Sequence, residues 1–300
     1  MISVVVPTHN RADLLPRAIK SIQAQTVKDL EIIIVSDGSE DNTREVVESL
    51  AKEDNRIKFI EYFPAKGGNI ARNIGIENAT GEYVAFLDDD DEFMPEKLER
   101  QMAVIEADPE IGLVYTGVRV IYVNECIEYS SVPKAEGDLS SEILLDNIIG
   151  TTSTVMARKE LLLQAGKFDV QLRALQDFDL WIRVCQLCKV GFVSEEMIRY
   201  YNYTGTKQVS ALTDKYIESF AYINKKYKDK MGILPADKMR EKKYNEYMLL
   251  GNKAMRNGDG KLARKYIKEA LSQIKSKKAM AYYLLSFFNY KVVLRLRSRV

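Results

Sequence analysis

The chain has 300 residues, of which 46% are hydrophobic and 29% are charged, and its formal net charge is +1. These values are typical of a globular protein with a sizeable core. The near-neutral charge argues against a nucleic-acid-binding protein that works by attraction over its whole surface.

Strand and helix patterns alternate through the first hundred residues. Short apolar runs predict four strands, at residues 2–7, 31–39, 57–62 and 83–90. Helical spacing of apolar residues predicts a helix in each gap, at residues 12–25, 42–54 and 68–79. This order predicts a mostly parallel central sheet flanked by helices, and therefore an α/β fold.

The pattern changes after about residue 95. A helix at 95–109 and a strand at 111–123 lead into more polar segments, which we interpret as an extension of the same domain that could hold a second substrate. From about residue 210 the spacing is helical, with two helices joined at Gly258 and Gly260. We therefore predict a large domain at 1–220, with halves 1–94 and 95–220, and a helical C-terminal region at 221–300.

Two features bear on the compartment. The first residues, MISVVVPTHN, lack a basic segment followed by a long apolar stretch, so we interpret them as a strand and not as a signal peptide. The three cysteines, Cys126, Cys185 and Cys188, are too few for a disulfide framework. We interpret them as reduced thiols, with a zinc or redox role for Cys185 and Cys188 as the lesser alternative. Both features predict a cytoplasmic protein.

Polar residues follow three of the predicted strands. Residues 8–11 follow the first strand, residues 36–39 the second and residues 88–91 the fourth. In parallel sheets, ligands bind beyond the carboxyl ends of the strands, where helix N-termini present free N–H groups. We therefore expect a pocket at this edge of the sheet.

The run Asp88-Asp89-Asp90-Asp91 ends an apolar strand. Adjacent carboxylates are costly there unless a cation neutralises them, and Mg²⁺ or Mn²⁺ binds such oxygen ligands while leaving positions open for phosphate. A bound metal would counter the negative charge that develops on a leaving nucleoside diphosphate. The alternative is an exposed acidic turn that starts a helix, because aspartates favour N-caps. The residues by themselves leave both interpretations open.

Two further segments carry candidate ligand-binding groups. Asp37, in VSDGSEDNT, could accept a hydrogen bond from a base N–H, which fits uracil, or could belong to an ordinary turn before a helix capped by Asp41 or Asn42. Arg72 and Asn73, in GGNIARNIG, could face a base or a diphosphate. In the alternative, this segment is an ordinary amphipathic helix and Arg72 is solvated.

Asp177 and Asp179 stand near the start of a predicted helix in ALQDFDLWIR. A carboxylate held at a helix N-terminus beside the pocket stays ionised at neutral pH, which suits a general base. An N-cap and a first-turn acid form the alternative. One aspartate could be the cap while the other is the base.

With these segments in order, the chain resembles the family-2 glycosyltransferases, enzymes with the GT-A fold. The matching stretches are VVVPTHNR, IIIVSDGSEDNT, GGNIARNIGIENATGEYVAFLDDDD and GKFDVQLRALQDFDLWIR, which together span residues 2–183. The resemblance implies a hexosyltransferase of the EC 2.4 class that uses a nucleotide sugar and a divalent metal, Mn²⁺ or Mg²⁺, and inverts the anomeric carbon. It assigns the nucleotide-sugar half to 1–94 and the acceptor half to 95–220.

The resemblance also implies roles for individual residues. Those expected around the nucleotide sugar are Pro7, Thr8, Asn10, Arg11, Asp37, Arg72, Asp88 and Asp89. Asp90 is the expected direct metal ligand, Asp88 lies nearer the ribose or donor sugar, and Asp91 is not needed as a ligand. The family's Glu-Asp base motif appears here as Gln176-Asp177. Asp177 is therefore the expected general base, and the acceptor contact of the missing Glu is not carried over.

The implied reaction is a direct displacement. One base suffices for it, so His9, the only histidine, receives no catalytic role. The segment at 202–210 has the placement of the family's loop over the diphosphate, and its Lys207 could contact phosphate or be solvated. Asp37 favours a UDP-sugar, although dTDP presents the same imide edge and GDP also stays open. No motif reports the donor sugar, the acceptor or the linkage.

Two other functions compete with this interpretation. One is a nucleotidyltransferase that forms nucleotide sugars, but the segment PTHNRADLL lacks the glycine- and basic-rich phosphate loop expected after its first strand. The other is a protein that binds a nucleotide or glycan without catalysis, which would leave Asp90 and Asp177 idle.

The C-terminal segment 275–300 has seven basic residues and no acidic one, and its apolar runs are too short to span a membrane. It could lie in an anionic membrane interface, or it could pack on the domain with a solvated basic face. Membrane contact fits a lipid-linked glycan acceptor in surface polysaccharide synthesis, at the inner face of the plasma membrane. The helices at about 244–271 resemble a tetratricopeptide-like hairpin, which should pack on the catalytic domain or on another subunit, so a homodimer stays open.

Overall fold

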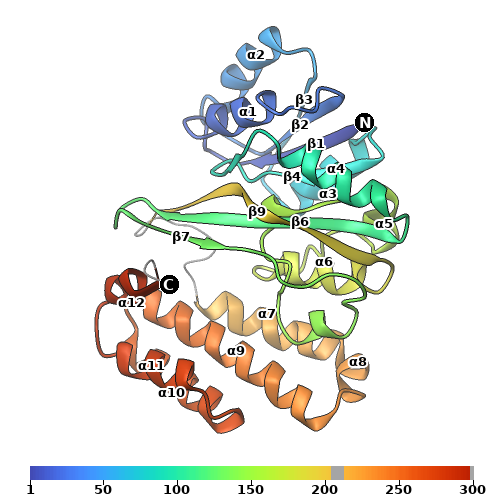
Figure 1. Ribbon diagram of the computed structural model, residues 1–300. Helices are drawn as coiled ribbons and strands as arrows, with labels where there is room; N and C mark the ends of the chain where they lie inside the picture. Colours follow the sequence, from blue (N-terminus) through green and yellow to red (C-terminus); the bar gives the residue numbers. More distant parts are fainter. Residues whose placement is uncertain (204–212, 298–300) are drawn as a thin grey trace.

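The computed structural model describes residues 1–203 and 213–297. A nine-stranded sheet fills the first two thirds of the chain, and the C-terminal helices form a block at the end remote from the first helices (Figure 1). The strands are β1 (Ile2–Thr8), β2 (Leu30–Asp37), β3 (Ile57–Tyr62), β4 (Tyr83–Phe86), β5 (Glu92–Phe93), β6 (Ile111–Tyr122), β7 (Ile127–Ser131), β8 (Met156–Arg158) and β9 (Lys189–Asn202).

The strand order is β3-β2-β1-β4-β8-β6-β9-β5, with β7 paired to β6. The first four strands are parallel, and Val5 in β1 lies opposite Ile33 in β2 and Phe86 in β4. β8 is antiparallel to both of its neighbours, whereas β6 and β9 are parallel to each other. The predicted α/β fold with a mostly parallel sheet and a helical C-terminal extension is confirmed, with β5, β7 and β8 running antiparallel to their neighbours.

Helices cover both faces of the sheet. Successive side chains of a strand point to opposite faces, so apolar side chains on each face pack against helices. Val4 and Val6 pack into one buried cluster and Val5 into the other. The helices of this region are α1 (Leu15–Gln23), α2 (Thr43–Glu53), α3 (Gly68–Asn78), α4 (Lys97–Ala107), α5 (Lys159–Gln164) and α6 (Gln176–Val184), with short 3₁₀ turns η1 (Glu142–Leu144) and η2 (Thr152–Thr154). The cluster around Val4 and Val6 takes its helical residues from α1, α2 and α4. The cluster around Val5 takes them from α3, α5 and α6 and also contains Phe220, Met231 and Leu250 of the C-terminal helices.

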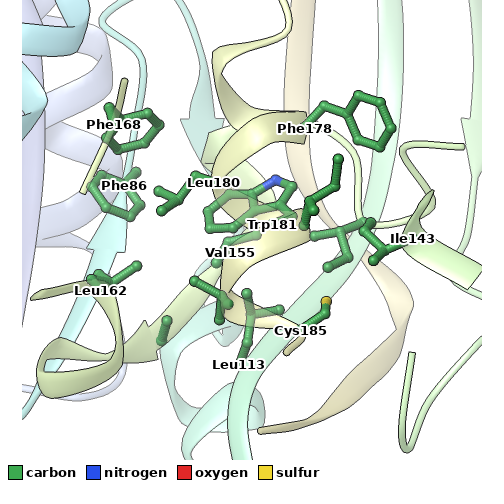
Figure 2. Close-up of a cluster of buried hydrophobic side chains, with 14 of the residues drawn as sticks. Phe86, Leu113, Ile143, Val155, Leu162, Phe168, Phe178, Leu180, Trp181 and Cys185 are labelled. Carbon is green, nitrogen blue, oxygen red and sulfur yellow. The ribbon is translucent and has the colours of Figure 1, made fainter. Parts of the chain in front are cut away.

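α6 is anchored by Trp181, which is fully buried (Figure 2). Its ring meets Phe168 edge to face, and Phe168 meets Phe86 of β4 in the same way. The indole N–H donates to the carbonyl oxygen of Gly150 at 3.1 Å, so the polar atom of the ring is satisfied. These contacts fix the start of α6 relative to the end of β4.

The C-terminal helices are α7 (Thr213–Lys226), α8 (Lys228–Gly232), α9 (Ala236–Arg256), α10 (Gly260–Gln273), α11 (Lys277–Leu285) and α12 (Tyr290–Arg297). α9 and α10 form the predicted hairpin and turn at Gly258, whose φ of 78° suits glycine. Ala254 and Ile267 from this hairpin share a buried cluster with Tyr122 of β6, so the hairpin packs on the sheet domain. α7 passes through residue 220, and the domain division placed there stays a prediction. Over the residues that the structure describes, no helix is both long and apolar enough to cross a membrane.

Candidate active site

The carboxyl ends of β1, β2 and β4 open into a cavity of about 820 Å³. Most of the residues predicted around a ligand line this one cavity: Pro7, Thr8, Arg11, Asp37, Arg72, Asp88, Asp89, Asp90 and Asp177. His9, which received no role, lines it as well, and its ring Nδ1 lies 2.5 Å from the carbonyl oxygen of Asp37. The polar strand ends and the start of α6 therefore meet in space, as the sequence pattern predicts.

Asn10 differs from the other predicted residues because it is exposed and does not line the cavity. Its φ is 52°, its N–H donates to Ser39 Oγ at 3.1 Å, and its side-chain oxygen accepts from the N–H of Glu40 at 2.7 Å. Asp41 adds a second link, since its carboxylate accepts from the N–H groups of both Thr43 and Ala12. Asn10 and Asp41 thus fasten the loop after β1 to the loop after β2.

Asp37 is buried on the cavity wall and organises a neighbouring loop. Its carboxylate accepts hydrogen bonds from the Tyr62 hydroxyl at 2.7 Å and from the N–H groups of Lys66 and Gly67 at 2.6 and 2.8 Å. Gly38 follows at φ +61°, and a Cβ there would lie only 2.5 Å from the backbone nitrogen of Ala65. Glycine is required at this position because the two loops touch. The predicted contact between Asp37 and a base stays a prediction.

Two arginines pair with three of the four aspartates of the run. Arg11 Nη1 donates to Asp89 at 2.7 Å and to Asp90 at 2.9 Å, and Arg72 pairs with Asp88. The pKa of Asp89 is raised to about 6. Burial and the neighbouring charge of Asp90 raise it, and Arg11 opposes both. The run is therefore a buried ionic cluster at the cavity, and the alternative of an exposed acidic turn is wrong.

Asp91 points away from the cavity. It is fully buried and accepts a hydrogen bond from Ser153 Oγ at 2.7 Å. Burial raises the pKa of this carboxyl well above its usual range. Asp91 does not line the cavity, and that it is not needed as a ligand stays a prediction.

The carboxylates at the end of β4 suit a divalent ion whose shell is completed by a bound diphosphate. Within residues 1–203 and 213–297 no group of three or more His, Cys, Asp or Glu side chains is arranged to enclose a metal. Mg²⁺ is usually held by one or two carboxylates while phosphate and water complete its shell, and Mn²⁺ accepts the same oxygen donors. Asp88 and Asp90 both line the cavity, so the residues fit an ion that is shared with a diphosphate.

Arg72 is buried, and its guanidinium lies over the ring of Phe168 at 5.7 Å. The alternative of a solvated Arg72 is therefore wrong. Asn73 does not line the cavity: its side-chain nitrogen donates to the carbonyl oxygen of Phe168 at 2.9 Å, and its side-chain oxygen accepts from the N–H of Phe168 at 2.8 Å. Asn73 thus holds Phe168 beneath the arginine.

Asp177 lies half-buried at the start of α6. Burial raises its pKa to about 6, opposed by the hydrogen bond from the N–H of Phe178 and by the charge of Arg72. A carboxylate with this pKa is mostly ionised at pH 7 and is more basic than an ordinary aspartate, so it can accept a proton from a bound hydroxyl. Its position on the cavity wall gives it access to a ligand.

Asp179 has a structural environment. It is fully buried, pairs with Arg183 at 2.7 Å and with Lys226 at 2.8 Å, and accepts from the Tyr227 hydroxyl at 2.8 Å. It therefore ties α6 to α7. The expectation that one of the two aspartates caps α6 is wrong, because the N-cap is Leu175 in a left-handed conformation with φ 58°.

Four lining residues come from the C-terminal helices and were not predicted. Lys215 and Tyr216 belong to α7, and Leu249 and Lys253 belong to α9. The pKa of Lys253 is lowered to about 7. Burial and the charge of Arg256 lower it, and the charge of Asp177 opposes both. These residues stand in ordinary helical patterns, so no local signal marks them. Lys207 and most of the predicted phosphate loop lie outside the described residues.

The sequence model of glycosyl transferase family 2 matches residues 3–162. The chain therefore belongs to glycosyl transferase family 2. An uncharacterized glycosyltransferase of Haemophilus influenzae is 36% identical over 187 residues, which are 62% of each chain. A Campylobacter jejuni protein named GalNAc(5)-diNAcBac-PP-undecaprenol beta-1,3-glucosyltransferase is 53% identical over 94 residues, 31% of this chain and 30% of the relative. The chain thus spans less than two thirds of the length of these relatives.

Two solved structures resemble the whole chain. Staphylococcus aureus TarS 1-349 in complex with UDP-GlcNAc has a TM-score of 0.65 at 18% identity, covering 99% of this chain and 88% of that one. The mannosyltransferase PcManGT from Pyrobaculum calidifontis, in complex with GDP-Man and Mn²⁺, has a TM-score of 0.63 at 17% identity, covering 99% and 86%. At these identities the likeness shows the fold.

Proposed function

We propose that the protein is an inverting glycosyltransferase that moves a hexosyl group from a UDP-sugar to a hydroxyl group of a saccharide acceptor. The observation that carries the proposal is the cavity that Asp177 shares with Asp88, Asp89 and Asp90. A half-buried base with a pKa raised to about 6 and a carboxylate set suited to a shared divalent ion are the two groups that such a transfer requires.

The donor is proposed to bind at the ends of β1, β2 and β4. Pro7 and Thr8 would contact the nucleoside, and Asp37 would accept the imide N–H of uracil. Asp88 would lie near the ribose or donor sugar. The family membership of residues 3–162 supports this placement, and the related folds hold UDP-GlcNAc in TarS and GDP-Man with Mn²⁺ in PcManGT.

A divalent ion bound at Asp90 would act as a Lewis acid that counters the charge of the leaving diphosphate. Asp177 accepts the proton of the acceptor hydroxyl as the oxygen attacks the anomeric carbon from the face opposite the nucleotide. The bond between the anomeric carbon and the diphosphate oxygen breaks with its electrons on the diphosphate. The displacement inverts the anomeric carbon, and Asp177 is the one base that the step uses.

The acceptor is proposed to be a glycan or a lipid-linked saccharide of surface polysaccharide synthesis. The name of the Campylobacter relative, which describes a glucosyltransferase for an undecaprenol-linked saccharide, supports this choice. We further propose that α11 and α12 contact the inner face of the plasma membrane. Four large apolar side chains of these helices and their connection are at least half exposed, namely Met280, Leu284, Phe287 and Phe288, and the segment carries no acidic residue.

The Asp177→Asn substitution tests the assigned base. It keeps the shape of the side chain but removes its capacity to accept the proton, so we expect transfer to fall about 10²–10⁴-fold. Binding of UDP should stay unchanged in calorimetry because Asp177 does not contact the nucleotide in this proposal. Asp237→Asn, an exposed acid at the start of α9, is the matched control and should leave transfer unchanged. Retained turnover in Asp177→Asn would rule out the proposed base.

A further inference from the structure

The two long C-terminal helices α7 and α9 present a cationic wall to the active-site cavity. Lys215 and Lys253 line it, together with Tyr216 and Leu249. The acidic residues that line the described part of the cavity come from other elements: Asp37, Asp88, Asp89, Asp90, Asp146 and Asp177. At the strand ends the carboxylates are paired with Arg11 and Arg72, whereas the lining residues that the structure describes on α7 and α9 include two lysines and no carboxylate.

Lys253 is held in place within this wall. Its ammonium lies over the ring of Tyr216, 4.3 Å from the ring centroid, which is a favourable cation–π distance. The side chain is half-buried, and burial lowers its pKa to about 7, with Arg256 lowering it further. An ammonium that has lost part of its hydration gains more from an anionic ligand than a fully solvated lysine does.

The wall lies close to the proposed base. Asp177 is near enough to raise the pKa of both Lys253 and Tyr216 by its charge, although burial is the larger influence on each. If Asp177 accepts the proton of the acceptor hydroxyl, the acceptor must reach this side of the cavity. Tyr216 and Leu249 offer it an aromatic ring and an apolar side chain beside the two lysines.

We propose that Lys253, supported by Lys215, forms a subsite for an anionic group of the acceptor, either a carboxylate or a phosphate. The inference rests on the proposed function, because Asp177 marks the acceptor side only if it is the base. It specifies the chemical class of the acceptor, which the sequence motifs leave undefined.

The test uses the full chain saturated with UDP and Mn²⁺, so that the donor site is filled. Three probes are titrated by calorimetry or ligand-observed NMR: methyl β-D-glucuronide, glucose 1-phosphate and the neutral methyl β-D-glucoside. We expect at least one anionic probe to bind about tenfold or more tightly than the glucoside, because hydrogen bonds to charged groups are the stronger kind. The tighter of the two anionic probes identifies whether an acidic sugar or a phosphate is preferred.

Substitutions test whether Lys253 and Lys215 cause the preference for an anionic probe. Lys253→Met should abolish it, Lys253→Arg should keep it, and Lys215→Met should reduce it. Lys243→Met removes an exposed lysine from the same helix and should change nothing. The thermal melting of each variant is compared with that of the wild type, and if Lys253→Met does not fold, Lys215→Met and Lys253→Arg still give the answer.

Equal binding of all three probes, or an anionic preference that survives in both Lys→Met variants, would overturn this subsite. Binding of UDP, which precedes the probe titrations, separates the anionic subsite from the proposed function. A protein that binds UDP but shows no anionic preference contradicts only the subsite, whereas a protein that fails to bind UDP contradicts the proposed function and removes the basis of the subsite with it.

Discussion

At the residue level, four adjacent carboxylates at the end of β4 are held by two arginines and a serine. Arg11 bridges Asp89 and Asp90, Arg72 pairs with Asp88, and Ser153 donates to Asp91. Buried charges are strongly unfavourable unless they are paired, so the arginines make the aspartate run compatible with an apolar strand. Asp177 lies outside this run, at the start of α6, and burial raises its pKa to about 6, as it does for Asp89.

The raised pKa of Asp177 predicts a pH dependence for transfer. The base is active when it is ionised, so kcat/KM for the acceptor, measured at saturating donor and metal, should rise with pH and bend near pH 6. With an anionic acceptor it should fall again above about pH 7, where Lys253 loses its charge. Saturating donor separates this effect from Asp89, whose pKa is also about 6 but whose proposed contacts are with the donor. A bend near pH 4, the ordinary range of an aspartate, would contradict the assigned base.

At the element level, short contacts between loops fix the three strand ends relative to one another. Asn10 and Asp41 join the loops after β1 and β2, and Asp37 joins the second of these loops to the start of α3. Arg17 of α1 donates to the carbonyl oxygen of Asp90 at 2.7 Å and lies over the ring of Tyr201 in β9. The cavity edge is thus built from cross-links that hold elements distant in sequence together.

The helices α11 and α12 lie at the end of the molecule remote from α1 and α2 (Figure 1). Phe287 and Phe288 between them are 61% and 64% exposed, and the basic residues nearby have no acidic neighbour in the segment 275–300. Apolar insertion combined with attraction to anionic lipid predicts binding to phosphatidylglycerol-containing vesicles and not to phosphatidylcholine alone, with weaker binding at high salt. Vesicle sedimentation measures this directly.

A double variant tests whether Phe287 and Phe288 are responsible for vesicle binding. Phe287→Ser with Phe288→Ser should lower the bound fraction severalfold, since each buried aromatic side chain contributes to partitioning. Phe63→Ser changes an aromatic residue that is 58% exposed on the β3 side and serves as the matched control. Wild-type protein that stays in the supernatant with both lipid mixtures would contradict membrane contact and favour helices with a solvated basic face.

At the level of the whole molecule, the sequence predicted the parts whose signals are local. The run at 2–7 matches β1 closely because a strand buried on both faces is almost continuously apolar. The run at 57–62 matches β3, which is an edge strand and is only partly buried. β8 was not predicted as a separate strand because it has only three residues, Met156–Arg158. The cavity wall on α7 and α9 escaped prediction for another reason: Lys215 and Lys253 reach the site through long-range packing, which leaves no motif in the sequence.

The central claim is that the ends of β1, β2 and β4 bind a nucleotide diphosphate together with a divalent ion at Asp90. Calorimetric titration with UDP, GDP and dTDP, each with and without Mn²⁺, tests this claim most directly because it requires no acceptor. We predict that UDP binds, that Mn²⁺ strengthens the binding, and that Asp90→Ala loses most of the gain due to the metal. An absence of metal-dependent binding to all three nucleotides would contradict the account.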